Sequence, residues 1–175
     1  MTNGAEATTA TWRAAGESHD LDLAASCLAE DVQIISPLTA KFRFRGRDQA
    51  RDMLAAAFDV IDTIRYHTEL GDQSARALFF HGRCRQQEFE EAQLLRFDAD
   101  GRILEVTLFG RPLPGLTAVM AAIGPVMLKR QRRPALARLV GAATAPLALM
   151  TRAGESRLVP LADPNRANAG LRAVQ

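Results

Sequence analysis

A chain of 175 residues, 47% hydrophobic and 24% charged, is long enough for one domain with a sizeable core and too short for two ordinary domains. Its charge is unevenly distributed: residues 1–128 carry 13 Lys and Arg against 18 Asp and Glu, whereas residues 129–175 carry 9 against 2. We expect the basic part either to be solvated or to contact an acidic partner, a membrane surface or the acidic body of the protein.

Patterns typical of metal sites, nucleotide sites and covalent catalysis are missing. Cys27 and Cys84 lie far apart, and neither forms a Cys-x-x-Cys pair or a cluster with one of the three histidines. No glycine-rich phosphate loop or catalytic triad pattern is present. We therefore expect no metal, no cofactor and no disulfide framework. The start of the chain has neither a basic segment nor a long apolar one, which predicts no secretory signal and a cytoplasmic protein.

Two short helices are predicted at the start of the chain. Residues 1–8 are expected to be flexible, and a helix follows over 9–16 with Trp12 as its only large apolar side chain. Residues 20–28 place their apolar side chains on one face of a second helix. Residues 32–35 then predict a short strand.

Residues 41–46 alternate Lys or Arg with Phe, which is the period of a strand with one wet face. Strands that bind single-stranded nucleic acid can show this pattern. Because only two aromatic residues occur here and the surrounding sequence is acidic, we expect no nucleic-acid partner. Residues 47–61 follow with apolar side chains at helical spacing.

Period-two patterns dominate the next part of the chain. Residues 63–70 place Ile64, Tyr66, Thr68 and Leu70 on one face and Arg65, His67 and Glu69 on the other. Residues 75–84 form another predicted strand, although Gly82 could mark a bulge that switches faces.

The segment 89–112 predicts a long hairpin that reverses at Asp98-Ala99-Asp100-Gly101, where glycine can take the positive φ of a tight turn. If Gln93 points inward, Leu95 and Phe97 should do so too, whereas Leu94, Ile103 and Phe109 should point outward. Helices early and strands late predict an α+β fold in which a curved, largely antiparallel sheet forms a cone with helices on its concave side. We expect a homodimer to cover the apolar outer face of the sheet.

Four features of the sequence are typical of one known superfamily. They are the Trp12 helix, LAEDVQIISP (Leu28–Pro37), Arg45-Gly46-Arg47 and LLRFDADGRILEVTLFGRPLPGL (Leu94–Leu116). Through them the chain resembles the nuclear-transport-factor-2-like superfamily and, within it, the SnoaL-like group of polyketide-cyclase-like and ketosteroid-isomerase-like proteins. This resemblance covers about residues 9–116. It implies a cystatin-like α+β barrel with a conical cavity for a small apolar, even polycyclic, molecule, and it constrains the fold more than the activity.

At the positions that correspond to the functional residues of ketosteroid isomerases, this chain has hydrogen-bond donors but no acid–base groups. The general base of that family corresponds to Ser36, which cannot act as a base without an activating group. The tyrosine and the protonated aspartate of the family's oxyanion hole, an arrangement known from ketosteroid isomerase itself, correspond to Trp12 and Gln93. Both can donate a hydrogen bond, and neither can transfer a proton.

Other branches of the superfamily leave few further candidates. An epoxide-hydrolase-like reaction would need an Asp–Arg–Asp set, but Asp98 and Asp100 are expected to serve the turn. A cyclase-like reaction would need an acid or base deep in the cone. The candidates are His81 first, then His67, with His19 as a minor one and Glu88, Glu90 and Glu91 as an alternative source of a carboxylate near the mouth of the cone. His81 can lie on either face of its strand; on the outer face it would be a partly exposed residue at the dimer interface.

Two hypotheses follow. In the first, the protein binds a small apolar ligand or acts as an assembly domain, and transfers no proton. In the alternative, it is an isomerase or cyclase that uses His81 as the acid–base group and Gln93 and Trp12 as donors. The residues expected to line the cavity are Trp12, Ser36, Phe58, Tyr66, Phe80, Gln93 and Leu108.

Beyond the resemblance, residues 117–150 predict a helical extension with a kink or break at Pro125. A basic cluster, which we define as Lys129, Arg130, Arg132 and Arg133, lies within it. Residues 135–150 are apolar but are expected to be too short and too interrupted to cross a membrane. They could lie on an anionic membrane surface beside the basic cluster, or pack on the protein itself or a dimer partner. Residues 151–175 are expected to be a loose tail.

Overall fold

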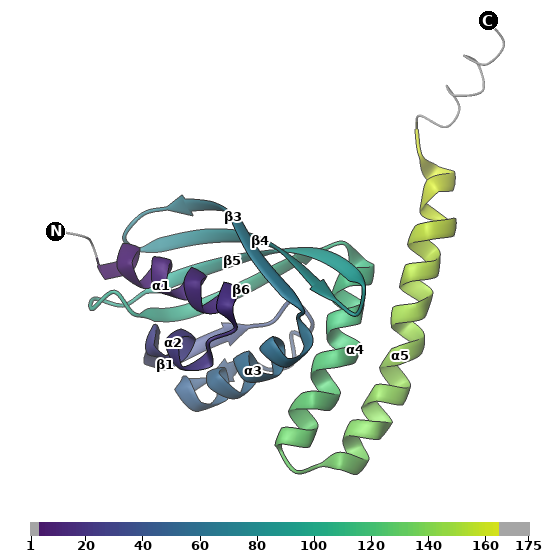
Figure 1. The fold of residues 1–175 in the computed structure, drawn as a ribbon, viewed down its shortest axis with the longest axis horizontal. Coiled ribbons are helices and arrows are strands. Elements are labelled where there is room, and N and C mark those ends of the chain that lie inside the picture. Colours follow the sequence, from purple (N-terminus) through teal and green to yellow (C-terminus); the bar gives the residue numbers. More distant parts are fainter. Residues whose placement is uncertain (1–3, 165–175) are drawn as a thin grey trace, which may run out of the picture.

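A computed structural model describes residues 4–164 and shows the expected α+β architecture (Figure 1). A single curved sheet is covered on its concave side by helices, and a helical hairpin follows at the carboxyl-terminal end. The elements are α1 (Gly4–Ser18), α2 (Leu21–Ser26), β1 (Leu28–Ile35), β2 (Phe44–Arg45), α3 (Gly46–Val60), β3 (Thr63–Gly71), β4 (Ala75–Cys84), β5 (Gln87–Phe97), β6 (Ile103–Arg111), α4 (Leu113–Arg130), α5 (Pro134–Arg157) and the 3-10 helix η1 (Val159–Ala162).

The sheet has six strands in the order β2-β1-β6-β5-β4-β3. Neighbouring strands are antiparallel except β1 and β6, which are parallel. In Figure 1, α1, α2 and α3 lie under the curved sheet and α4 stands at its open end. This arrangement confirms the predicted cone, because long antiparallel strands twist and curl around the helices that fill their concave face.

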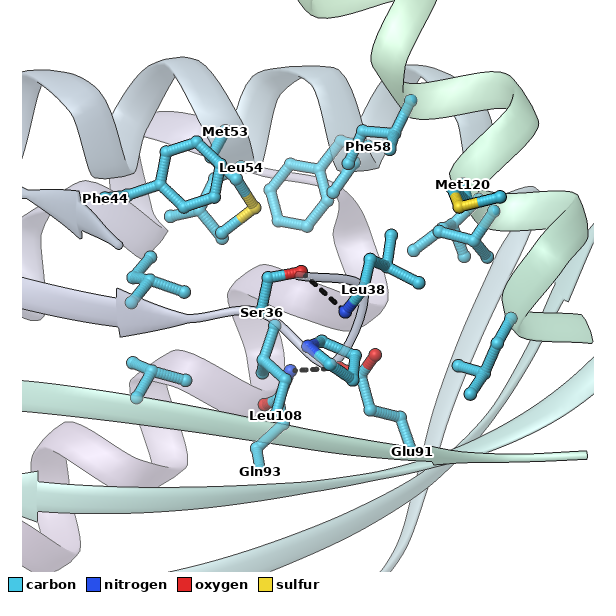
Figure 2. Close-up of a pocket in the computed structure, with 18 of the residues that line it drawn as sticks. Ser36, Leu38, Phe44, Met53, Leu54, Phe58, Glu91, Gln93, Leu108 and Met120 are labelled. Carbon is cyan, nitrogen blue, oxygen red and sulfur yellow. Dashed lines mark hydrogen bonds between the residues drawn. The ribbon is translucent and has the colours of Figure 1, made fainter. Parts of the chain in front are cut away.

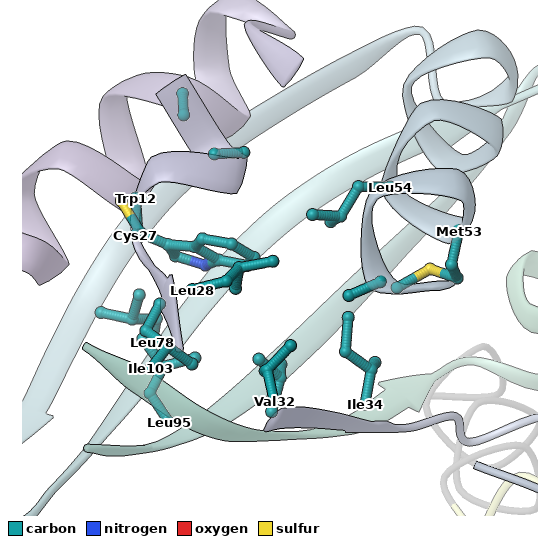
Figure 3. Packing of buried hydrophobic residues seen from close by; sticks show 14 residues of the cluster. Trp12, Cys27, Leu28, Val32, Ile34, Met53, Leu54, Leu78, Leu95 and Ile103 are labelled. Atoms are coloured by element: carbon teal, nitrogen blue, oxygen red, sulfur yellow. The ribbon is translucent and has the colours of Figure 1, made fainter. Parts of the chain in front are cut away.

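The closed end of the cone is filled by a tight apolar cluster (Figure 3). Leu28, Leu95 and Ile103 are fully buried there, and Trp12 is only 4% exposed. The prediction that Ile103 points outward is wrong. A register shift between Arg96 and Phe97 in the β5–β6 pairing accompanies the turn, and Ile103 joins the inner cluster.

A second irregularity changes the faces of β3. The β3–β4 register shifts between Tyr66 and Thr68, so that His67 is an extra, unpaired residue. Before it, Ile64 and Tyr66 point inward as expected. After it the alternation is reversed, because Glu69 pairs opposite the buried Leu78 and the predicted inner residue Leu70 is 61% exposed.

The β5–β6 turn has the chemistry that the sequence predicts. Gly101 has φ +77°, and Oδ1 of Asp98 accepts hydrogen bonds from the backbone N–H groups of Asp100 and Arg102 at 3.0 and 2.8 Å. Asp98 therefore serves the reversal of the chain.

The helical parts extend further than expected. Helix α1 begins at Gly4, so residues 4–8 are not a flexible segment, and α4 continues past Pro125. Only Phe44 and Arg45 of the predicted strand 41–46 pair with β1.

Helix α5 also departs from the prediction. It runs without interruption through Gly141 and Pro146 to Arg157, so the expectations of an interrupted segment over 135–150 and of a loose tail over 151–157 are wrong. Pro146 lies on the exposed side of the helix, where water can take over the hydrogen bond that proline cannot make. Residues 159–162 of the predicted tail form η1, and residues 165–175 lie outside the described residues. Residues Pro134–Ala162 are long and apolar enough to cross a membrane, by length and composition alone. The most apolar 18 residues of this span have a mean hydropathy of 1.3, and only 6% of them are buried within the protein.

Candidate functional site

A cavity of about 280 Å³ lies between the concave face of the sheet and helices α3 and α4. Its wall is almost entirely apolar, and Figure 2 shows Met53, Leu54 and Phe58 on one side and Leu108 with two polar residues of β5 on the other. The structure brings together on this wall all seven residues expected from the sequence: Trp12, Ser36, Phe58, Tyr66, Phe80, Gln93 and Leu108.

A hydrogen-bonded network centred on Gln93 supplies most of the polarity of the cavity. The indole Nε1 of Trp12 and the hydroxyl of Tyr66 each donate to Oε1 of Gln93 over 2.9 Å. Trp12 can only donate, so this contact orients the amide with its oxygen toward α1 and its nitrogen toward the mouth of the cavity. The indole N–H is thereby occupied, and Trp12 is not the free donor to a ligand that the sequence suggested.

The amide nitrogen of Gln93 contacts the carboxylate of Glu91, which the sequence suggested only as an alternative source of an acid or base. Nε2 of Gln93 donates to Oε1 of Glu91 over 3.2 Å, and both side chains project from β5 into the cavity (Figure 2). Glu91 and Gln93 share this face with Leu95 because side chains two positions apart on a strand point the same way. The inward direction predicted for Gln93, Leu95 and Phe97 is thus confirmed.

The environment of Glu91 favours the protonated form of its carboxyl group. Desolvation by the apolar wall raises the pKa of Glu91 to about 7, and the hydrogen bond from Gln93 lowers it by less. None of the ion pairs within residues 4–164 includes Glu91. A carboxyl group of this kind can both accept and return a proton near neutral pH.

Tyr66 remains a donor throughout the neutral range. Burial raises its pKa far above the usual range of tyrosine, and the nearby carboxylates of Glu91 and Glu17 add to the effect. The ring also explains Gly16 in α1, since a Cβ there would lie 3.1 Å from the Tyr66 hydroxyl oxygen. The small residue lets the tyrosine reach Gln93.

Ser36 lies on the cavity wall, directly after the end of β1. Its Oγ accepts a hydrogen bond from the backbone N–H of Leu38 over 3.1 Å (Figure 2). This contact shapes the turn that leads out of the strand. No described base is bonded to the hydroxyl group, so nothing activates it as a nucleophile.

His81, the acid–base candidate of the alternative hypothesis, does not face the cavity. The β4–β5 register is regular from Ala75 to Cys84, so Phe80 and Gly82 point inward and His81 points to the outer face. Gly82 does not mark a bulge. It makes room for the ring of Phe89, whose Cζ atom would lie 2.5 Å from an added Cβ.

The other two histidines are also absent from the cavity wall. His67, the unpaired residue of β3, is on the outer face with His81. His19 stacks on Phe58 with ring centroids 5.3 Å apart, behind the wall. Of the acidic candidates, Glu88 and Glu90 point outward and only Glu91 points inward.

The helical extension forms part of the site, which the sequence analysis did not anticipate. Residues of α4 and α5 close the mouth of the cavity. They are Leu116, Val119, Met120, Ile123, Gly124 and Met127 of α4 and Val140 and Thr144 of α5. The helical spacing of the α4 residues was visible in the sequence, but no local pattern indicates that their apolar face covers a cavity rather than a core.

Comparisons with known proteins agree with this architecture. Residues 9–106 match the family described as SnoaL-like domain. A steroid delta-isomerase from Pseudomonas aeruginosa superposes with a TM-score of 0.64 at 29% sequence identity, covering 74% of this chain and 92% of that one. A protein with a cystatin-like fold from Silicibacter pomeroyi superposes with a TM-score of 0.68 at 24% identity, covering 71% and 88%.

A SnoaL-like protein from Burkholderia thailandensis shows the same fold at 19% identity, with a TM-score of 0.54 and coverage of 64% of this chain and 98% of that one. No functionally curated protein matches the chain. The family match covers more than half of the chain and coincides with the cone, from α1 to β6. The chain therefore belongs to the SnoaL-like domain family, in the nuclear-transport-factor-2-like superfamily.

Proposed function

We propose that the protein is a cofactor-independent enzyme that moves a proton on a small, largely apolar carbonyl compound, with Glu91 as the acid–base group. The observation that carries this proposal is the position of Glu91, whose carboxyl group projects into a cavity with a largely apolar wall, where desolvation raises its pKa to about 7. A proton-transfer group is most effective when its pKa is close to the operating pH. The cavity volume of about 280 Å³ suits a small ligand.

The arrangement around Glu91 fits proton abstraction next to a carbonyl group. The carboxylate would take a proton from the carbon beside the carbonyl, and the C–H electron pair would move to give an enolate with its charge on oxygen. Nε2 of Gln93 carries two hydrogens, and only one is needed for Glu91. The second can donate to the enolate oxygen, and Glu91 then returns the proton to another carbon of the conjugated system.

Similarity to known proteins supports the reaction class. The steroid delta-isomerase from Pseudomonas aeruginosa is 29% identical, and its name denotes an isomerase. This chain differs at the position where the resemblance places the base, since Ser36 has no carboxylate. Glu91 would supply the carboxylate from a different strand, so the proposed activity depends on this site and not on the fold alone.

Ligand binding and proton transfer can be measured separately. Trp12 is the only tryptophan in the chain and lines the cavity, so quenching of its fluorescence reports binding. A β,γ-unsaturated cyclic ketone is a suitable probe, because its isomerisation gives a conjugated enone that absorbs in the ultraviolet. Exchange of its α-hydrogens with deuterated water reports proton transfer even when no isomerisation follows.

We expect Glu91→Gln to bind this ketone and to lose isomerisation and exchange by about 100-fold or more. Glu88→Gln, on the outer face of the same strand, should match the wild type. The wild-type kcat/KM should rise with pH through about 7, because the carboxylate must be ionised to accept the proton. Equal rates in wild type and Glu91→Gln would contradict the role of Glu91.

A second candidate function is retained for one reason: the wall of the cavity has little polarity beyond the Gln93 network and Glu91. Such a cavity can bind an apolar molecule without changing it. Saturable quenching of Trp12, with neither exchange nor isomerisation of any ketone tested, would indicate a ligand-binding protein.

A further inference from the structure

Three side chains that can bind a metal gather on the outer face of the sheet, on the side opposite the cavity. One ligand atom each from His67, His81 and Glu90 lies within 4.8 Å of the other two. His81 and Glu90 are directly opposite each other in the β4–β5 register. His67 reaches them because it is the extra residue at the irregularity in β3. One side chain from each of three neighbouring strands is thus directed toward the same point.

The distance between the ligand atoms of His67 and Glu90 suits a small first-row metal ion. Nε2 of His67 lies 3.4 Å from Oε1 of Glu90. Two ligand atoms bound tetrahedrally at about 2.0–2.1 Å from a zinc ion are separated by roughly 3.3 Å. The ring of His81 stacks on that of His67 with centroids 4.4 Å apart and must tilt to aim its nitrogen at the same ion. His81 is exposed, so it has room to do so.

Neighbouring groups already orient the ligand atoms. Nδ1 of His67 lies 2.9 Å from Oγ1 of Thr68, and in the tautomer that donates from Nδ1 to this hydroxyl group the lone pair of Nε2 is free to bind a metal ion beside Glu90. Arg111 binds only Oε2 of Glu90, through both its Nε and its Nη2 atoms. Oε1 is thereby left to face His67. Such supporting contacts are typical of metal ligands.

We propose that His67, His81 and Glu90 bind a divalent transition-metal ion, zinc by preference, through two imidazole nitrogens and one carboxylate oxygen. This set of ligands matches that of zinc sites in which a fourth position is open to water. The ion would link β3, β4 and β5 from outside, directly behind Tyr66, Phe80 and Glu91 of the cavity wall. The site is separate from the proposed proton transfer, and neither proposal depends on the other.

Metal binding can be measured on the untagged full-length protein, freed of metal by a chelator. Calorimetric titration with zinc ions and the visible absorption of added cobalt ions give stoichiometry and affinity. We expect one ion per chain and an increase in melting temperature on adding zinc. His67→Ala and His81→Ala should each weaken binding at least 10-fold and abolish the thermal shift, and Glu90→Gln should weaken binding to a smaller extent.

His19→Asn is the matched control, because His19 is the one other histidine of the chain and lies behind the cavity. Asparagine tolerates the positive φ of 56° at this position. The proposal is overturned if wild type and His81→Ala bind zinc equally well, or if wild type shows no binding above that of the double variant His67→Ala/His81→Ala. In the second case the cluster is only a stacked, carboxylate-paired histidine pair.

Discussion

The amide nitrogen of Gln93 donates to Oε1 of Glu91 over 3.2 Å, and this bond joins the proposed acid–base group to the interior of the protein. On its other side the same amide accepts hydrogen bonds from Trp12 and Tyr66. The position of Glu91 is thus determined by a buried network that reaches α1 and β3. Stability and chemistry should be coupled through it.

The stability of the protein should depend on pH through Glu91. Its pKa is raised from the ordinary 4.5 to about 7, so the folded state holds this proton more tightly than the unfolded state does. The contribution of Glu91 to stability is therefore full below about pH 4.5, falls as pH rises from there to about 7, and is constant above. The rise from 4.5 to about 7 corresponds to an upper bound of roughly 3–4 kcal/mol, and water in the cavity would reduce it.

Glu91→Gln removes this titration and keeps the shape of the side chain. We expect the variant to be more stable than wild type at pH 8 and similar to it at pH 4, as measured by urea denaturation. A difference between the two proteins that is the same at both pH values would show that Glu91 titrates normally.

Gln93→Leu should destabilise the protein, because Trp12 and Tyr66 would lose their common acceptor. A buried donor left unpaired costs about 1–3 kcal/mol, and two donors are affected. Adding Tyr66→Phe to Gln93→Leu should recover part of this loss in chemical denaturation, whereas Tyr66→Phe alone should destabilise the wild type. Additive effects of the two substitutions would argue against a shared network.

Gly82→Ala should disturb the inner face of β4. The added methyl group would lie 2.5 Å from Cζ of Phe89 and 3.0 Å from a ring carbon of Phe80, and such overpacking costs about 1–3 kcal/mol. Gly154→Ala in α5 is the control, since nothing lies within 4 Å of the added methyl group there. It should be neutral or raise the melting temperature slightly, because alanine favours helix over glycine. A destabilising Gly154→Ala together with a neutral Gly82→Ala would contradict this packing.

We propose that the protein forms a homodimer through the outer face of the sheet. Leu104 and Phe109 of β6 are 36% and 55% exposed there, and an apolar surface of this kind is commonly covered in an oligomer. Phe109→Glu is expected to shift the sedimentation coefficient from dimer to monomer. Leu70→Glu, at the far end of β3, should have a smaller effect. A monomeric wild type at micromolar concentration would contradict the proposal.

We also propose that α5 lies on an anionic membrane surface. Its outer side exposes Leu139, Leu149 and Met150, and it contains no acidic residue before Glu155. The basic cluster lies just before α5. Within it, Arg130 forms an ion pair with Asp59, with 2.7 Å between Nη2 and Oδ2. The other three members of the cluster are exposed. Those three can contact lipid headgroups.

Co-sedimentation with vesicles tests the membrane proposal. Binding to vesicles that contain phosphatidylglycerol should exceed binding to phosphatidylcholine alone. The triple variant Lys129→Gln/Arg132→Gln/Arg133→Gln should lose about 100-fold in affinity, at about 1 kcal/mol per basic residue. Arg130→Gln is the control for charge already paired within the protein. Equal binding to both kinds of vesicle would exclude an electrostatic contribution.

Much of the fold could be predicted from local patterns. The long hairpin, its glycine turn and the inward direction of Gln93 follow from period-two alternation and turn chemistry within one continuous segment. The alternation also placed Glu91 on the same face as Gln93, yet the neighbouring Glu88 and Glu90 made it look like part of a solvated charge run. Parity with Gln93 was the signal that could have identified it.

Other features depend on contacts between distant segments. The outward direction of His81 required the regular register of β4 with β5, and the reversal after His67 required the irregular register of β3 with β4. The sequence by itself determined which residues alternate along each strand and which segments become helices, because these properties are local. Only the tertiary structure decided which face meets the cavity, that α4 and α5 close it, and that Glu91 holds its proton near pH 7, because strand register and desolvation depend on residues far apart in the chain.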